Sequence, residues 1–201
     1  MKTVDISKSV EIYNELMNGR MINREIISED GEFERNPLFT EVMDNVGAYT
    51  QQYEMSGHSI QYNTDYLYLF KGQSHESSKT ELSMKAYILL MIIGHYVNSQ
   101  GFVITSDRDT SKLSAIGGGL TLADIDKIQE TPVMKEMLER ADMKGDLYKV
   151  IKNILIERHI MHRNPVTGNI ILSGAGAHFF DELTENYKAE MELLRPTQVD
   201  H

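Results

Sequence analysis

Histidines are the residues of this chain whose spacing could support metal or acid–base chemistry. His159 and His162 stand three positions apart, but the first ends a predicted helix and the second lies on a predicted strand. No acidic residue is spaced to complete a zinc site with them, and the helical HExxH pattern is absent. His95 falls within an apolar helical segment, which indicates a packed or hydrogen-bonded core residue. We therefore predict no metal site and no catalytic histidine.

Two glycine-rich segments could present backbone amides to a phosphate. Residues 117–119 are three glycines, but Leu-Thr-Leu follows them instead of the Gly-Lys-Ser/Thr that ends a P-loop, so a hinge or loop is favoured. Residues 174–176, Gly-Ala-Gly, are interpreted as a strand-to-helix turn that small residues allow. The acidic run at 29–32 is interpreted as a solvated loop. Serine-hydrolase and kinase signatures are also missing, so we predict a protein that is not an enzyme and binds no cofactor.

The composition is that of a globular protein without cysteine. Of 201 residues, 41% are hydrophobic and 25% are charged, which suffices to bury a core. The lack of cysteine excludes disulfide scaffolds, cysteine-based zinc sites and thiol nucleophiles. The longest apolar run, residues 86–93, is shorter than the ~18 residues of a membrane helix, and the first residues do not resemble a secretory signal. We expect a cytoplasmic protein with no membrane partner.

The net charge bears on nucleic-acid binding. Lys and Arg total 20 against 30 Asp and Glu, which gives −10. This balance weighs against a free-standing, high-affinity nucleic-acid binder, because such proteins are usually basic.

Hydrophobic periodicity divides the chain into two halves of similar plan. In the first half, helices are predicted at 9–18 and 37–55, followed by a β-hairpin at 59–62 and 66–70. In the second half, helices are predicted at 81–100, from 121, at 132–141 and at 146–159. A hairpin at 160–162 and 169–172 and a last helix follow. This order predicts a mainly helical α+β chain of two tandem winged-helix domains, in which each hairpin is a wing.

The predicted organisation has four parts. An N-terminal winged-helix domain spans 1–72, a polar linker spans 73–80, a C-terminal winged-helix domain spans 81–190, and residues 191–201 form a tail. Apolar residues of the first helix share one face: Val10, Tyr13, Leu16 and Met17. Twelve methionines and an aromatic face at 37–55 suggest that some apolar surface packs on a partner or a second copy.

A mild basic patch lies on the predicted helix at 146–159, which is the DNA-reading helix of the second winged-helix domain, and on the wing that follows it. It consists of Lys149, Lys152, Arg158 and Arg163 against Asp146 and Glu157, a local excess of two positive charges. Such residues could contact phosphates without sequence preference. The charge pattern by itself slightly favours the other interpretation, an ordinary surface helix with scattered lysines.

Several segments together resemble a known family. They are the run at 18–23 (Asn-Gly-Arg-Met-Ile-Asn), the Asn-Pro-Leu-Phe at 36–39, the apolar helix at 82–97, and Ile-Ile-Leu-Ser at 170–173 leading to Phe179-Phe180. From about residue 10 to 187, the chain resembles the MukE/MksE family, the tandem winged-helix subunits of bacterial condensins. Its short length and lack of a long acidic tail are more similar to the MksE branch.

The resemblance implies partners rather than a reaction. It implies a homodimer bound to a kleisin subunit (MukF/MksF-like), which bridges an SMC ATPase (MukB/MksB-like) that entraps DNA and hydrolyses ATP. It implies that Lys149, Lys152, Arg158 and Arg163 contact clamped DNA. However, Ile156 and Glu157 stand where MukE has arginines, so kleisin binding is the better-supported expectation and DNA contact is weak or confined to the complex.

The implied role is chromosome organisation and segregation, on the nucleoid, or plasmid defence. The alternative is a dimeric winged-helix transcriptional regulator that places a recognition helix in the major groove.

Overall fold

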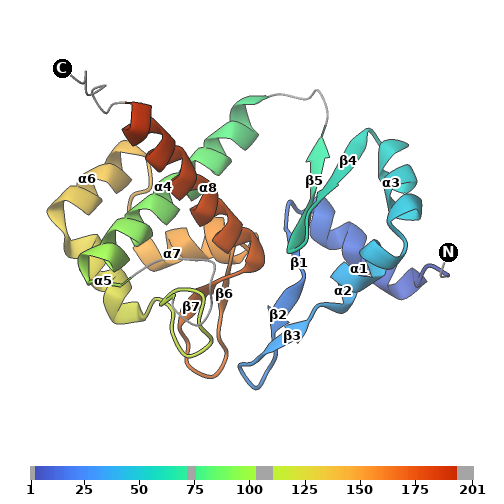
Figure 1. Cartoon of the computed structure of the whole chain (residues 1–201), viewed down its shortest axis with the longest axis horizontal. Helices are drawn as coiled ribbons and strands as arrows, with labels where there is room; N and C mark the ends of the chain where they lie inside the picture. The colour runs from blue at the N-terminus through green and yellow to red at the C-terminus, as the bar shows by residue number, and fades with distance from the viewer. Residues whose placement is uncertain (1–2, 72–75, 103–110, 194–201) are drawn as a thin grey trace, which may run out of the picture.

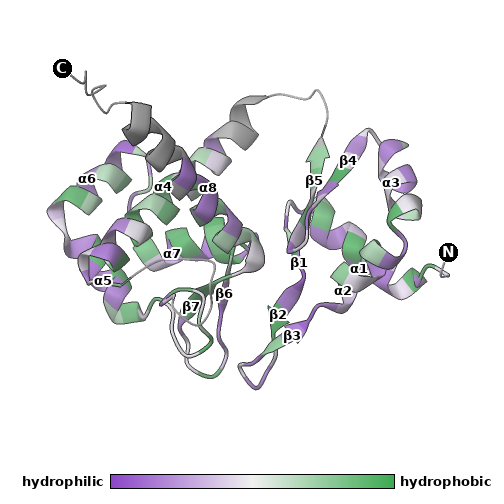
Figure 2. Cartoon of the chain, viewed as in Figure 1, coloured by the Kyte–Doolittle hydropathy of each residue, from purple (hydrophilic) through white to green (hydrophobic). Residues whose placement is uncertain are grey.

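The chain folds into two halves that lie side by side, coloured blue to cyan and green to red in Figure 1. The structure is a computed structural model and describes residues 3–71, 76–102 and 111–193. Each half has its own cluster of buried apolar residues, one within 12–67 and the other within 86–180. The helices carry hydrophobic and hydrophilic residues together (Figure 2), as expected for helices that cover a core on one side.

The first half contains three helices and two small sheets. Strand β1 pairs with β5 and β5 with β4, all antiparallel, while β2 and β3 form a separate hairpin. The elements are α1 (Ile6–Met17), β1 (Ile22–Asn23), β2 (Glu25–Ile27), β3 (Phe33–Arg35), α2 (Pro37–Asp44), α3 (Val46–Glu54), β4 (His58–Tyr62) and β5 (Tyr66–Lys71).

The second half is mostly helical, and its described residues include one hairpin, in which β6 and β7 are antiparallel. Leu120 adds an isolated bridge to Ile170 at the edge of that hairpin. The elements are α4 (Glu76–Ser99), α5 (Leu122–Glu130), α6 (Pro132–Arg140), α7 (Leu147–Ile151), the π-helix η1 (Lys152–Ile156), β6 (Met161–Arg163), β7 (Ile170–Leu172) and α8 (Gly174–Leu193).

The prediction of a mainly helical α+β chain with small antiparallel hairpins is confirmed. Its assignment to the winged-helix class remains a prediction. The start of α5 agrees with the sequence in detail, because Thr121 and Asp124 form the reciprocal hydrogen bonds of a capping box.

One predicted helix, at 37–55, is wrong in its continuity. The structure breaks it at Asn45, where φ is −127°, into α2 and α3. The Asn45 side chain donates a hydrogen bond to the Glu41 carboxylate at 3.0 Å. An asparagine bonded locally in this way competes with helix continuation.

The predicted apolar face of α1 is only partly buried. Leu16 lies in the core together with Ile12, whereas Val10, Tyr13 and Met17 are exposed. The β2–β3 hairpin was not predicted at all, and the acidic run at 29–32 forms its turn. Gly31 supplies the left-handed backbone of that turn, with φ of +82°.

Helix α4 begins at Glu76, inside the segment predicted as a linker, and residues 72–75 lie outside the described part. The predicted tail begins within α8, and residues 194–201 are also outside the described part.

Candidate nucleic-acid interface and the seam between the two halves

The predicted second reading helix corresponds to α7 and η1. It begins at Asp146, whose carboxylate accepts a hydrogen bond from the Lys149 backbone amide at 3.3 Å. Ile151 and Leu155 are fully buried in the second core. The opposite side of this helix therefore faces solvent, and Lys152 is exposed there.

Three of the four candidate DNA-contacting residues present their charges to solvent. The Lys149 side chain is 76% exposed, and its ammonium lies 3.9 Å from the Asp146 carboxylate. Lys152 is exposed on η1, and Arg163 is exposed at the end of β6. A surface ion pair at this distance holds Lys149 only weakly, so all three cations are accessible to a phosphate.

Arg158 has a different position. It is half-buried against the first half of the chain, where its Nη1 donates to the Gly19 carbonyl at 3.4 Å. Its Nε is buried without a hydrogen-bond partner among the described residues. Burial lowers the pKa of this guanidinium below its ordinary value. The structure thus places Arg158 in a contact between the halves rather than on the exposed basic surface.

The end of η1 is turned toward the first half by His159. This residue has φ of +60°, and the hydrogen bonds from His159 N to Ile156 O and from Ile160 N to Leu155 O close the helix as a Schellman motif. The left-handed conformation is unfavourable for a residue with a side chain. In this conformation the His159 imidazole Nδ1 lies 3.0 Å from the Met21 carbonyl oxygen, which is on the other side of the boundary between the halves.

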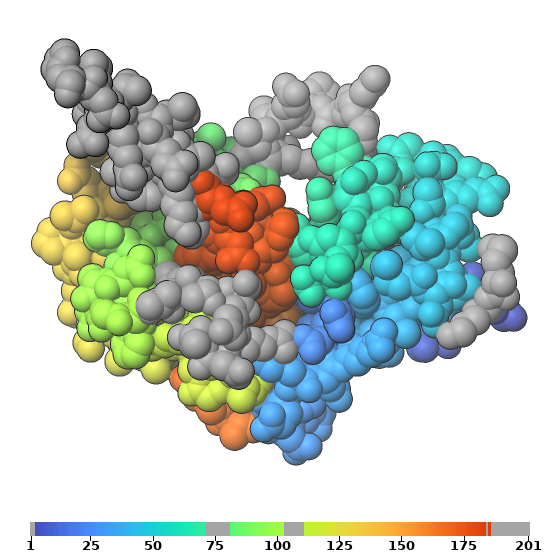
Figure 3. Space-filling model, viewed as in Figure 1, coloured from blue at the N-terminus to red at the C-terminus, as the bar shows by residue number. Residues whose placement is uncertain are grey.

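Two buried asparagines complete this boundary, which we call the seam. Asn23, 2% exposed, donates to the His159 carbonyl at 2.7 Å and accepts from the Ala175 amide at 2.9 Å. Asn164, also 2% exposed, donates to the Gly31 carbonyl at 3.1 Å. Because such bonds are directional, the seam sets the relative orientation of the two halves. Figure 3 shows the orange-red part of α8 in contact with the green-cyan hairpin of the first half.

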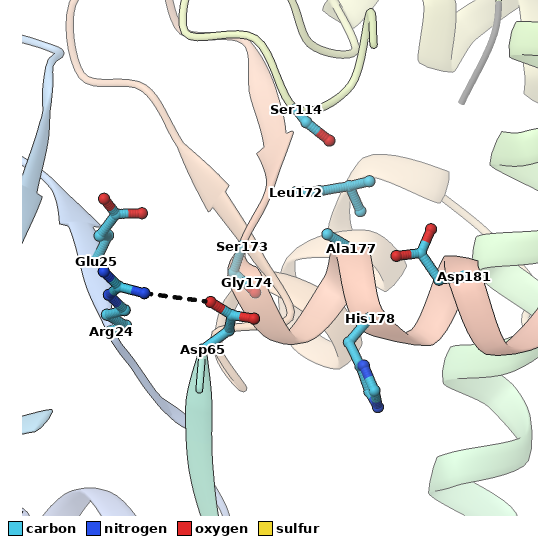
Figure 4. Close-up of a pocket in the computed structure, with 10 residues that line it drawn as sticks. All are labelled: Arg24, Glu25, Asp65, Ser114, Leu172, Ser173, Gly174, Ala177, His178 and Asp181. Atoms are coloured by element: carbon cyan, nitrogen blue, oxygen red, sulfur yellow. Dashed lines mark ion pairs between the residues drawn. The ribbon is translucent and has the colours of Figure 1, made fainter. Parts of the chain in front are cut away.

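A cavity of about 440 Å³ opens at the seam beside the start of α8 (Figure 4). Arg24 and Asp65 face each other across it, with 3.9 Å between Nη1 and Oδ1. Two of the first amides of α8 are not free to bind an anion, because Ala175 N–H donates to Asn23 and Gly176 N–H donates to Ser173 Oγ at 3.1 Å. The prediction of a strand-to-helix turn at 174–176 is wrong in its position, because these residues form the first turn of α8 and the connection from β7 is Ser173 alone.

The three glycines at 117–119 form a tight turn. The Gly119 amide donates to the Lys112 carbonyl at 2.6 Å, and a Cβ on Gly118 would lie only 2.2 Å from that same oxygen. Gly118 and Gly119 are needed for close packing, whereas a Cβ on Gly117 would meet nothing within 4 Å. The segment is a loop, as predicted.

The histidines also take structural positions. The rings of His159 and His162 lie 6.1 Å apart, and the Glu15 Oε2 is 3.6 Å from His159 Nδ1. Within the described residues, no group of three or more suitable side chains could hold a metal ion. Burial, with a smaller effect of His159, lowers the pKa of His162 to about 4. The prediction of a core His95 is wrong, because this side chain is exposed on α4.

The seam asparagines were not identified from the sequence. The one local signal is a polar amide within a strand: Asn23 directly follows Ile22, and asparagine is depleted in strands.

These features describe a mainly helical, two-part protein whose halves are joined by buried polar contacts and which exposes a small basic surface. A family model for the condensin complex protein MksE matches residues 7–184, and the chain belongs to this family. Searches among curated proteins and among solved structures gave no match. None of the described helices combines the length and apolar character needed to cross a membrane.

Proposed function

We propose that the chain is a non-catalytic accessory subunit of a bacterial SMC–kleisin complex, in which it binds the kleisin as a homodimer. The observation that carries the proposal is the family match over residues 7–184, which includes both halves and the whole seam. In this proposal the kleisin connects the subunit to the SMC ATPase, which performs the ATP hydrolysis. The complex acts in the cytoplasm on the nucleoid, in chromosome organisation or plasmid defence.

We further propose that residues 1–72 and 81–190 are two winged-helix domains, with 73–80 as the connection and 191–201 as a tail. The two separate hydrophobic clusters and the hairpin in each half support this division. The seam then makes the pair a single docking body with a defined shape.

Co-expression with the genomic neighbours tests the proposed function. The chain should purify in a stable complex with a kleisin-like protein, and a coiled-coil ATPase should join through that protein. Purification of the chain alone, with both neighbours present and folded, would contradict the proposal.

DNA contact in the assembled complex is assigned to Lys149, Lys152 and Arg163. Reversing all three charges to Glu should weaken DNA retention by the complex and reduce its salt dependence, because each phosphate contact releases counterions. A matched control reverses three other exposed cations: Lys135, Arg140 and Lys144. Equal retention by both variants would show that the first three form only a solvated surface.

The regulator alternative makes a distinct prediction. The isolated chain would then select a site from random genomic fragments at physiological salt, through base contacts. Its charge of −10 weighs against this.

A further inference from the structure

Helix α1 carries an apolar stripe that the fold leaves uncovered. The stripe consists of Ile6, Val10, Tyr13 and Met17, whose exposed fractions are 80%, 58%, 47% and 44%. With about 100° of turn per residue, the four positions fall within roughly 60° of the helix circumference. The core side of α1 is separate and contains Ile12 and Leu16. A contiguous exposed stripe of this kind marks an interaction surface.

The stripe points away from the second half of the chain. Glu15 lies about 180° around the helix from Ile6, and it faces the seam, where its carboxylate is 2.9 Å from Arg20 and 3.6 Å from His159. The start of α1, near the N label in Figure 1, also lies at the end of the molecule farthest from the second half. A partner on the stripe therefore leaves the seam and the exposed basic residues accessible.

The stripe is free of charge, and so are the positions that border it: Ser7, Ser9 and Asn14. The charged residues of this helix lie farther round, with Glu11 about 140° and Lys8 about 200° from Ile6. Since the whole chain carries −10, two copies have the same net charge and repel each other as they approach. A neutral apolar stripe is a surface on which two identical acidic molecules can meet without facing like charges.

The spacing of the stripe is also self-complementary. Two copies of α1 laid antiparallel place Ile6 opposite Met17 of the second copy, and the same register places Val10 opposite Tyr13. Both pairs satisfy one two-fold axis through the middle of the helix, as an isologous contact requires. We propose that α1 is the surface through which two copies of this chain pair, antiparallel and in this register.

This inference rests on the homodimer in the proposed function and gives it a location. The paired first halves form the centre of the dimer, and the second halves lie at its outer ends. Four partly exposed apolar side chains from each copy bury on the order of 1,000 Å², at the lower end for specific interfaces. The dimer of the free chain is therefore expected to dissociate on dilution.

Crosslinking tests the register, and the absence of native cysteine makes it clean. Ile6→Cys and Met17→Cys proteins are oxidised separately and as a mixture. The mixture should form a disulfide-linked dimer, whereas each protein alone should not, because equivalent positions lie about 16 Å apart along antiparallel helices. Crosslinking of each protein with itself, or no crosslinking at all, overturns the register.

A charge substitution tests the surface. Val10→Glu should raise the dimer dissociation constant by about 100-fold, because the two-fold axis brings in two unpaired charges. Val133→Glu is the matched control, since Val133 is 64% exposed on α6 in the second half. Light scattering over a dilution series gives both constants, and circular dichroism verifies the fold. Equal constants for the two variants overturn the proposal.

Co-purification with the kleisin distinguishes pairing of two copies through the stripe from binding of the kleisin to the stripe. Retention of the kleisin by a monomeric Val10→Glu variant supports the stripe as the surface between copies. Loss of the kleisin with an unchanged dimer of the free variant assigns the stripe to the kleisin and overturns the pairing. If the wild-type chain dimerises through the stripe but never binds a kleisin, the proposed function fails and the pairing stands.

Discussion

Replacing Asn23 by alanine removes the most connected side chain of the seam. The wild-type amide donates to His159 O at 2.7 Å and accepts from Ala175 N at 2.9 Å. Asn23→Ala leaves the His159 carbonyl and the Ala175 amide, at the start of α8, without these partners. Each buried group that loses its partner costs roughly 1–3 kcal/mol, and partial entry of water reduces the sum. We expect the free energy of unfolding to fall by about 2–4 kcal/mol.

Equilibrium urea unfolding measures this change. With an m-value of about 2 kcal/mol/M, the midpoint should fall by about 1–2 M. Hydrogen exchange should increase at the Ala175 amide, which a general loss of stability alone would not single out. Asn14→Ala is the control, because Asn14 is exposed on α1, and its effect should stay within about 0.5 kcal/mol. If Asn23→Ala and Asn14→Ala have the same midpoint and exchange pattern, the seam does not hold the halves together.

Three further predictions concern the second half. The folded pKa of His162, about 4, lies below the unfolded value near 6.5, so its neutral form is favoured by folding. The contribution of neutral His162 to the free energy of unfolding is therefore fully present above pH 6.5, and about 3 kcal/mol of it is lost as the pH drops to 4. Urea titrations at each pH measure this loss, and His162→Gln should flatten it. Tyr96→Phe should lower the unfolding free energy by about 1–2 kcal/mol, because it deletes the 2.7 Å hydrogen bond from the phenol to Asp124. If acid unfolding of this variant has the same pH profile as that of the wild type, the phenol does not stabilise the Asp124 carboxylate. Gly118→Ala should lower the melting temperature while Gly117→Ala leaves it unchanged, since a Cβ would meet a backbone carbonyl only at the former.

Local elements of this protein could be predicted because neighbouring residues determine them. The capping box of Thr121 and Asp124 acts over three positions, and it starts α5 where the sequence indicates. The strand alternation at 59–62 and 66–70 likewise forms the hairpin of β4 and β5. Periodicity alone did not predict the break at Asn45, because the hydrogen bond from its side chain to Glu41 competes with continuation of the helix.

The candidate site was only partly predictable. Lys149, Lys152 and Arg163 are exposed, as a basic surface requires, but the charge pattern could not distinguish them from Arg158. That distinction depends on Gly19, which lies 139 positions earlier in the chain. The same limit applies to His95, because an apolar segment does not reveal which of its faces a distant element covers.

The amino-acid sequence by itself determined the absence of cysteine, the acidic balance and most of the helices and hairpins, since each depends on composition or on residues a few positions apart. Only the tertiary structure decided that α1 exposes Val10, Tyr13 and Met17, and that Asn23 and Asn164 join the halves across separations of 152 and 133 residues. Burial and directional hydrogen bonding are properties of the packed chain, because a side chain acquires its neighbours only when segments distant in sequence come together.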